Sequence, residues 1–136
     1  MAKTTILIID DHADTRLLVS ARLKKHQYDT VFAADALQAI AVARQTQPDA
    51  IILDLGLPGG NGFIVMERLK ANTMLSSIPV IILTADESPE SEFKGLEAGA
   101  AAFLHKPVQE EALIAAVGDA VGSVSESPIA NARLEF

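Results

Sequence analysis

IILDLGLPGG, residues 51–60, contains an aliphatic run that ends in a carboxylate and is followed at once by glycine and proline. The apolar residues before Asp54 predict a short buried strand, because such a run is too short for a helix. A charged side chain is costly in an apolar interior unless a partner neutralises it. Asp54 therefore either reaches solvent where the strand ends or is held in place for chemistry.

Aliphatic runs of the same kind recur along the chain and set the fold class. The predicted strands are 5–9, 30–34, 50–53, 80–83 and 101–104. Their near-continuous hydrophobicity is typical of a parallel sheet that is covered on both faces. Helical patterns lie between the strands. Strictly alternating units of this kind predict an α/β fold, a flavodoxin-like doubly wound (βα)5 three-layer sandwich with strand order 2-1-3-4-5.

Apolar residues recur at helical spacing between the strands. The predicted apolar faces contain Leu17, Leu18 and Ala21, then Leu37, Ile40 and Ala41, then Val65, Met66 and Leu69, and finally Leu113, Ile114, Val117 and Val121. Segment 88–99 predicts a further helix with Ser88 as its N-cap, Pro89 at its first position and Gly99 at its end. Asp35 is expected to cap the second helix.

The composition excludes several classes of protein. A chain of 136 residues fits one domain. No apolar run approaches the roughly 20 residues of a membrane span, and nothing at the N-terminus predicts a signal peptide. The net charge of -7 argues against nucleic-acid binding by this chain, and the lack of cysteine excludes disulfides and thiolate chemistry. We therefore expect a cytoplasmic protein that makes no membrane contact and handles cations or meets basic surfaces.

Polar residues follow four of the predicted strands. They are Asp10 and Asp11 after the first strand, Asp54 after the third, Thr84 after the fourth, and Lys106 and Pro107 after the fifth. Ligands of such folds bind beyond the carboxyl ends of the strands, where the strand order reverses. Three carboxylates crowded there repel one another unless a cation neutralises them, and oxygen ligands suit Mg²⁺. With a lysine and a hydroxyl to hold phosphoryl oxygens, the pattern predicts a phosphoryl-transfer site.

Each of these signals has an ordinary structural explanation when it stands alone. An Asp-Asp pair is commonly a helix N-cap, a single Asp is a solvated turn residue, and a Lys-Pro pair lies in a loop. Their joint occurrence, each after the appropriate strand, favours a site. His12 follows the acidic pair, and we interpret it as a partly exposed residue that opens the first helix, because Mg²⁺ prefers oxygen ligands.

Four longer motifs carry the same residues. They are IIDDH at 8–12, ILDLGLPGGNG at 52–62, ILTA at 82–85 and AGAAAFLHKP at 98–107. Together they resemble the receiver domains of two-component response regulators. The resemblance covers residues 3–121, which are expected to form the receiver domain. Residues 122–136 show no periodicity and are expected to be a flexible C-terminal tail or the remnant of a linker.

The resemblance implies a phosphoacceptor and a metal site. Asp54 would be the phosphoacceptor, forming an aspartyl phosphate. Asp11 and Asp54 would ligate Mg²⁺, with Asp10 acting largely through a bound water. The backbone carbonyl of Gly56 would supply a further ligand, and Mn²⁺ could substitute for Mg²⁺.

The resemblance also implies a switch. Lys106 would pair with the phosphoryl group or, before phosphorylation, with Asp54. Thr84 would hydrogen-bond a phosphoryl oxygen, and Phe103 would be the aromatic switch residue that turns inward when Thr84 moves. The bond before Pro107 would be cis, because cis peptide bonds are nearly always X-Pro bonds.

The implied function is that of a signalling phosphoacceptor rather than an enzyme, although the domain would assist its own phosphotransfer and dephosphorylation. A sensor histidine kinase or a histidine phosphotransfer protein would donate the phosphoryl group. Residues 88–99, 101–105 and 108–121 are expected to form the face for a downstream protein partner, for an effector domain absent from this chain, or for a homodimer. A stand-alone receiver and a piece of a longer regulator or hybrid kinase both fit the sequence.

Other residues border the expected cleft. Gly56 has no side chain where similar domains often carry a larger group, and that position influences the access of water to the phosphoryl group. Asp86 could help to orient water. Gly59, Gly60 and Gly62 are expected to let the chain fold tightly beside the site.

Three other interpretations explain less of the sequence. Asp10 and His12 match the Asp-x-His motif of cobalamin-binding modules, but Thr15 stands where that motif has glycine. That interpretation also leaves Asp54 and Lys106 unexplained. A flavin-binding module is disfavoured because the first loop lacks a Ser/Thr/Gly-rich phosphate cradle. The complete set of site residues argues against a receiver fold that no longer takes phosphate.

Overall fold

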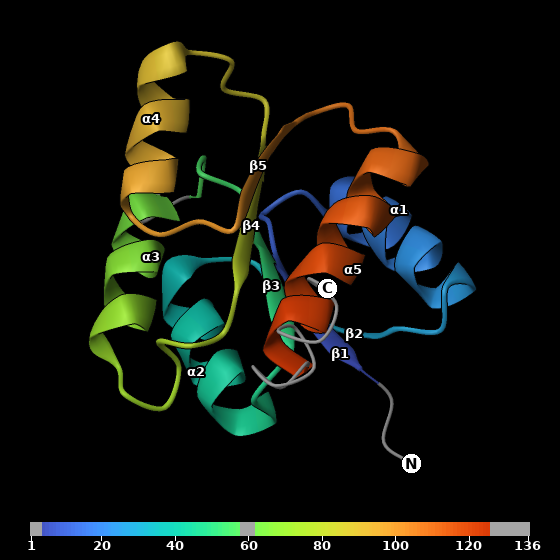
Figure 1. Cartoon of the computed structure of the whole chain (residues 1–136), viewed down its shortest axis with the longest axis horizontal. Coiled ribbons are helices and arrows are strands. Elements are labelled where there is room, and N and C mark those ends of the chain that lie inside the picture. The colour runs from blue at the N-terminus through green and yellow to red at the C-terminus, as the bar shows by residue number, and fades with distance from the viewer. Residues whose placement is uncertain (1–3, 58–61, 126–136) are drawn as a thin grey trace, which may run out of the picture.

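The computed structural model describes residues 4–57 and 62–125 as a three-layer α/β sandwich (Figure 1). Its strands are β1 (Thr5–Ile9), β2 (Asp29–Ala33), β3 (Ala50–Leu53), β4 (Val80–Thr84) and β5 (Ala102–His105). Its helices are α1 (Ala13–Lys25), α2 (Ala36–Thr46), α3 (Gly62–Ala71), α4 (Pro89–Glu97) and α5 (Glu110–Ser125). The strands pair in parallel in the order β2-β1-β3-β4-β5. The predicted doubly wound fold is confirmed.

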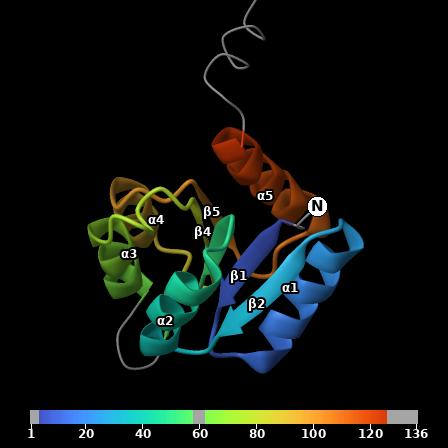
Figure 2. The same ribbon diagram turned by 90° about the horizontal axis from the view of Figure 1, so that it is seen from below.

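Helices cover both faces of the sheet. Figure 2 shows α1 and α5 on one face, and α2, α3 and α4 on the other. Successive side chains of a strand point to opposite faces, so Ile6 and Ile8 pack in the core below α1 and α5. Leu7 and Ile9 pack in the core below α2 and α3. Because both faces of β1 are buried, these residues are all apolar, and the sequence shows no alternation.

The strand boundaries differ slightly from those expected. β2 spans Asp29–Ala33 and β5 spans Ala102–His105, so each is displaced by about one residue. β4 continues to Thr84, which pairs with His105 of β5. The site threonine therefore belongs to a strand and is placed by the sheet itself.

The predicted helix ends at Asp35, Ser88 and Gly99 are confirmed. Asp35 accepts a hydrogen bond from the Gln38 N–H at 2.8 Å. Ser88 Oγ accepts one from the Ser91 N–H at 3.2 Å, at the start of α4. Gly99 lies just past α4 with a φ of +102°, which glycine adopts most readily.

The expected apolar face of α1 is wrong, and that of α2 is wrong except at Ile40, which packs against the core. Leu17 and Leu18 are 65% and 52% exposed, and α1 instead buries Val19, Ser20 and Leu23. Ser20 Oγ lies 2.7 Å from Thr30 Oγ1 of β2, so a hydrogen bond replaces an apolar contact there.

Leu37 of α2 is 78% exposed, and this helix packs through Ala36, Ala39 and Ala43. Small side chains allow the helix to approach the sheet closely. A prediction that places the most hydrophobic residues of a helix in the core does not take this into account. The expected faces of α3 and α5 hold: Val65, Met66 and Leu69 are buried, as are Leu113 and Val117.

A glycine brings α4 close to the edge of the sheet. Gly95 is the buried residue of α4. A Cβ atom at Gly95 would lie 2.8 Å from Ile82 Cδ1 and 3.0 Å from the Phe103 ring. The lack of a side chain therefore lets the α4 backbone pack directly on Phe103, the expected switch residue.

Helix α5 continues to Ser125 instead of ending at residue 121, so the expected tail begins later. Gly59, Gly60 and residues 126–136 lie outside the described residues. Within the described part of the chain, no helix combines the length and the apolar character that crossing a membrane requires.

Candidate functional site

The neighbouring strands β1 and β3 each place one carboxylate at the carboxyl end of the sheet. Ile9 of β1 pairs with Leu53 of β3, so Asp10 and Asp54 leave the ends of neighbouring strands together. The Asp54 N–H donates to the Ile9 carbonyl at 2.9 Å, which extends the ladder by one bond. Side chains placed by paired strands are held more precisely than side chains on a free loop.

Lys106 reaches both carboxylates from the end of β5, an edge strand of the sheet. It follows β5, and its N–H donates to the Thr84 carbonyl at 2.9 Å. Its Nζ lies 2.8 Å from Asp10 Oδ2 and 3.3 Å from Asp54 Oδ2. Asp10 and Asp54 are only 3% and 5% exposed, so both buried charges depend on this ammonium group.

The ammonium group of Lys106 is held in its charged form. Burial by itself lowers the pKa of Lys106. The hydrogen bond to Asp10 and the charges of Asp54 and Asp10 outweigh that effect and raise the pKa above its ordinary value. The site therefore keeps one positive charge beside its carboxylates at every physiological pH.

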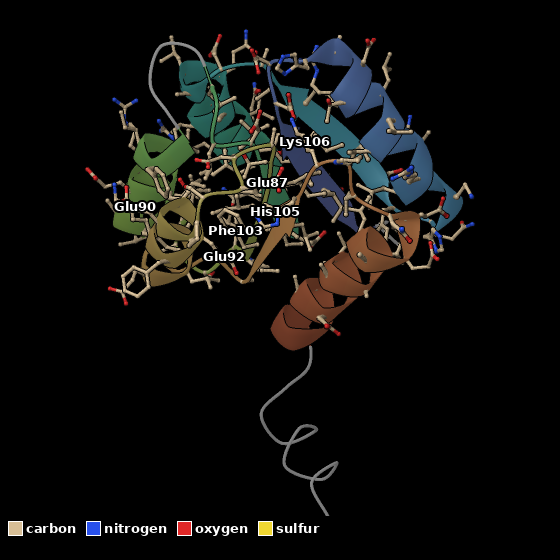
Figure 3. All side chains as sticks on the ribbon, turned by 90° about the horizontal axis from the view of Figure 1, so that it is seen from above. Glu87, Glu90, Glu92, Phe103, His105 and Lys106 are labelled. Carbon is tan, nitrogen blue, oxygen red and sulfur yellow. The ribbon has the colours of Figure 1, made fainter. Side chains whose placement is uncertain are left out.

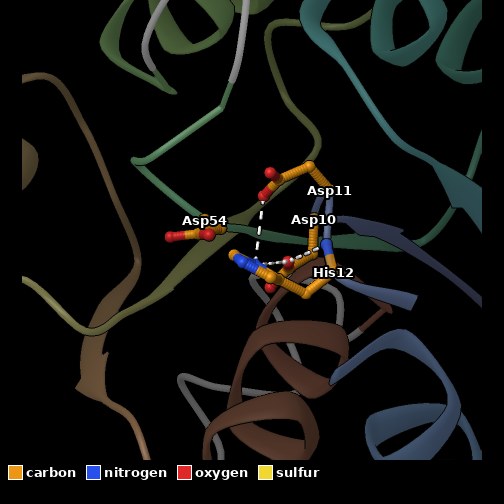
Figure 4. A group of neighbouring side chains, drawn as sticks. All are labelled: Asp10, Asp11, His12 and Asp54. Carbon is orange, nitrogen blue, oxygen red and sulfur yellow. Dashed lines mark hydrogen bonds and ion pairs between the residues drawn. The ribbon is translucent and has the colours of Figure 1, made fainter. Parts of the chain in front are cut away.

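Asp11 and His12 complete the acidic cluster (Figure 4). His12 Nδ1 lies 3.3 Å from Asp10 Oδ1 and 3.2 Å from Asp11 Oδ1. Asp11 Oδ1 is a buried atom that has no hydrogen-bond partner among the described residues. One ligand atom from each of Asp10, Asp11, His12 and Asp54 lies within 4.8 Å of all the others.

The residues present fit a divalent cation. Three carboxylates face a single ammonium group, so the cluster keeps an excess of negative charge. Asp11 Oδ1, which accepts no hydrogen bond from the described residues and lies 3.2 Å from the His12 ring, offers a further oxygen ligand. Hard carboxylate oxygens of this kind are the ligands that Mg²⁺ and Mn²⁺ prefer.

The approach to Asp54 is open on one side and tightly packed on the other. The Gly56 N–H donates to Asp54 Oδ1 at 3.2 Å, and Gly56 is exposed. A Cβ atom there would lie 3.9 Å from both carboxylate oxygens, so any side chain would border the acceptor. At Gly62 a Cβ atom would lie 2.7 Å from Leu55 Cα, so the start of α3 needs glycine to pass beside Asp54.

Thr84 is tied to the start of α4 through Asp86. The Asp86 N–H donates to Thr84 Oγ1 at 3.3 Å. The Asp86 carboxylate accepts hydrogen bonds from Ser91 Oγ at 2.5 Å and from the Ser88 N–H at 2.9 Å. These two bonds, the Ser91 bond first, lower the pKa of Asp86.

Phe103 lies on β5 with His105, three residues before Lys106 (Figure 3). Its ring is half-buried and meets the His105 ring edge-on, with 5.4 Å between the ring centroids. Within the described residues, neither Thr84 nor Phe103 bonds directly to the three carboxylates. The Lys106–Pro107 peptide bond is cis.

Two contacts of the site are not predictable from the sequence. Arg16 Nη1 donates to the Asp10 carbonyl at 2.7 Å, which fastens the first turns of α1 to the end of β1. The second is the pair of hydrogen bonds that Ser88 and Ser91 donate to the Asp86 carboxylate. Neither leaves a signal in the sequence, because basic residues in a helix and serines at a helix start are ordinary.

Residues 6–118 match the response regulator receiver domain family. The chain belongs to this family. The receiver is 37% identical over 109 residues to protein PilH of Pseudomonas aeruginosa, covering 80% of this chain and 90% of PilH. It is also 37% identical over 115 residues to the phosphate regulon transcriptional regulatory protein PhoB of the same organism. That match covers 85% of this receiver but only 50% of PhoB.

Solved structures agree with this assignment. The chemotaxis response regulator CheY4 of Vibrio cholerae superposes with a TM-score of 0.81 at 29% identity, covering 88% of the receiver and 99% of CheY4. The signal receiver domain of a signal transduction histidine kinase from Syntrophus aciditrophicus gives 0.83 at 29% identity, covering 91% and 94%. A receiver from a chemotaxis response regulator and one from a histidine kinase therefore share this fold.

Proposed function

We propose that this receiver takes a phosphoryl group on Asp54 from a sensor histidine kinase or a histidine phosphotransfer protein. The arrangement that carries the proposal is the meeting of Asp54, Asp10 and Lys106 at the carboxyl ends of three strands. Asp54 is nearly buried, yet its neighbour Gly56 is exposed and leaves the carboxylate approachable. A buried carboxylate with one open side suits a nucleophile that must admit a donor but limit water.

The transfer is a displacement at phosphorus. An oxygen of Asp54 attacks, and an O–P bond forms while the P–N bond to the donor histidine breaks. The electron pair of the broken bond leaves with the imidazole nitrogen. Lys106 stabilises the charge on the transferring phosphoryl oxygens, because its ammonium group already lies 3.3 Å from Asp54 Oδ2.

Mg²⁺ would be held by Asp11 and Asp54, by Asp10 largely through water, and by the backbone carbonyl of Gly56; Mn²⁺ could substitute. When bound, the ion neutralises the carboxylates and the incoming phosphoryl oxygens. The chain's own residues support this assignment, since Asp11 Oδ1 has no hydrogen-bond partner among the described residues. The domain thereby assists its own phosphorylation and dephosphorylation without acting on a separate substrate.

The phosphoryl group would switch the face made by α4, β5 and α5. Thr84 Oγ1 would leave the Asp86 N–H to bind a phosphoryl oxygen, which loosens the bonds that Asp86 makes to Ser88 and Ser91. Phe103, packed under Gly95 of α4, would then turn inward. The phosphoryl group can shift this equilibrium because it makes contacts in one state that it lacks in the other.

The switched face would bind a downstream protein, an effector domain or a second copy of the receiver. We expect the receiver to act in the cytoplasm without contacting a membrane. Its net charge of -7 also argues against direct contact with nucleic acid. Among the described residues, no helix is long and apolar enough to cross a membrane. The exposed Phe93 and Leu96 of α4 support a protein partner at this face.

Incubation with acetyl phosphate and Mg²⁺, followed by intact-protein mass spectrometry, tests the proposal. Wild type should gain one phosphoryl group, and Asp54→Asn should gain none. Asp14→Asn, which removes an exposed carboxylate from the first turn of α1, is the matched control and should behave as wild type. Uptake by Asp54→Asn equal to that of wild type would refute Asp54 as the acceptor.

A further inference from the structure

The His12 ring plays no part in capping helix α1. His12 is the N-cap of α1, but its side chain makes no capping hydrogen bond. The His12 backbone holds the start of the helix instead. Its N–H donates to Asp10 Oδ1 at 2.8 Å, and its carbonyl accepts from the Arg16 N–H at 3.1 Å. The backbone of His12 is therefore fixed, and its imidazole is not used to cap the helix.

That ring is directed at the acidic cluster. Nδ1 lies 3.3 Å from Asp10 Oδ1 and 3.2 Å from Asp11 Oδ1, and Figure 4 shows the ring lying against both side chains. The side chain is 66% exposed, so an incoming ion meets the imidazole at the mouth of the site. A ring nitrogen of His12 is one of the four ligand atoms that lie within 4.8 Å of one another.

We propose that His12 is a metal-specificity residue, which adds a nitrogen ligand when the site takes a borderline divalent ion such as Zn²⁺, Co²⁺ or Ni²⁺. The inference rests on the proposed metal site and extends it. Mg²⁺ takes oxygen and leaves the imidazole unused, whereas the later transition metals bind imidazole strongly. The site should therefore prefer these ions over Mg²⁺ more strongly than its carboxylates alone would.

The other two histidines of the chain lack this setting. His26 Nε2 lies 3.3 Å from Glu110 Oε2, but Lys25 Nζ lies 3.0 Å from the same oxygen, so a cation is already present there. His105 is half-buried against Phe103 and has no carboxylate bonded to it among the described residues. His26 therefore provides a matched control, an exposed imidazole beside a carboxylate but outside the metal cluster.

Calorimetric titration of the whole chain with Zn²⁺ and, separately, with Mg²⁺ tests the inference. The variants are His12→Phe, which keeps a ring but removes both nitrogens, His12→Ala, and the control His26→Ala. His12→Phe and His12→Ala should weaken Zn²⁺ binding by about tenfold or more and leave Mg²⁺ binding within about twofold. His26→Ala should change neither affinity. In wild type, NMR of the imidazole nitrogens should show the His12 Nδ1 signal moving with Zn²⁺ and not with Mg²⁺.

Two outcomes would overturn the inference. One is an equal loss of Zn²⁺ and Mg²⁺ affinity in both His12 variants, since the ring would then act on any cation. The other is unchanged Zn²⁺ affinity with a stationary Nδ1 signal. Wild type that binds neither ion would refute the proposed metal site as well, whereas normal Mg²⁺ binding with no His12 effect would refute the inference alone.

Discussion

The ammonium nitrogen of Lys106 lies 2.8 Å from Asp10 Oδ2, closer than its 3.3 Å distance to Oδ2 of Asp54, the proposed phosphoacceptor. The resemblance to receiver domains implies a pair between Lys106 and Asp54 before phosphorylation, and the structure adds Asp10 as the nearer partner. Lys106 therefore occupies the place of a counter-ion for both buried carboxylates. A divalent cation that enters the cluster competes with that ammonium group for the same oxygens.

Lys106→Ala should raise the affinity for Mg²⁺ by about tenfold, because removal of a neighbouring positive charge leaves the carboxylates without their internal partner. Calorimetry on the unphosphorylated protein measures this. Lys25→Ala removes an exposed lysine that pairs with Glu110 far from the cluster and should leave the affinity unchanged. An unaltered or weaker affinity in Lys106→Ala would contradict the counter-ion role.

The same Lys106→Ala variant should still take up some phosphoryl group but respond less to it. In the proposed switch, Lys106 would link the phosphoryl group to the end of β5, so its loss should leave α4 and β5 poorly coupled to the site. Amide chemical shifts of β4, α4 and β5 before and after phosphorylation report the response. Shifts as large as those of wild type would show that Lys106 is dispensable for switching.

Gly62→Ala should destabilise the fold by about 1–3 kcal/mol, because the new Cβ meets the backbone of Leu55 at 2.7 Å and something must move. Gly118→Ala is the matched control. A Cβ there meets no atom within 4 Å, and alanine in a helix should stabilise the protein by about 0.5–1 kcal/mol. Urea unfolding of both variants should show a lower free energy of unfolding for Gly62→Ala and a higher one for Gly118→Ala. Equal changes in the two variants would argue against the tight packing beside Asp54.

Glu110 should make stability depend on pH in acid. Hydrogen bonds from Lys25 first, and then from His26, lower the pKa of Glu110 below its ordinary value of 4.5. The contribution of these bonds is thus present above pH 4.5 and is lost as the pH falls through the lowered pKa. In urea unfolding over a pH series, wild type and Glu110→Gln should therefore differ near neutrality and converge in acid. A difference that is independent of pH would exclude this ion pair as its source.

The strand pattern predicted the fold because five aliphatic runs, each followed by a helical pattern, leave few other topologies. The buried faces of the helices were harder to predict from the sequence. In α2 the residues that meet the sheet are Ala36, Ala39 and Ala43, and the more hydrophobic Leu37 faces solvent. The small alanine side chains let α2 pack closely against the sheet. The sequence shows the size and hydrophobicity of each side chain, but not how closely a helix approaches the sheet.

The candidate site was predictable in its members but not in its contacts. Asp10, Asp54 and Lys106 each follow a strand, so topology alone brings them to one edge. The preference of Lys106 for Asp10, the bond from Arg16 and the position of the His12 ring depend on side-chain conformations. Spacing along the chain carries no information about those conformations, which is why His12 was assigned only to the start of a helix.

Chemical trapping of the phosphorylated residue tests the central claim most directly. Sodium borohydride reduces an aspartyl phosphate to homoserine, and peptide mapping by mass spectrometry then locates the modified position. After incubation with acetyl phosphate and Mg²⁺, homoserine should appear at residue 54 and be absent from an untreated sample. Homoserine at Asp10 or Asp11 instead, or a stable phosphoryl group on a histidine, would contradict the assignment of Asp54 as the phosphoacceptor.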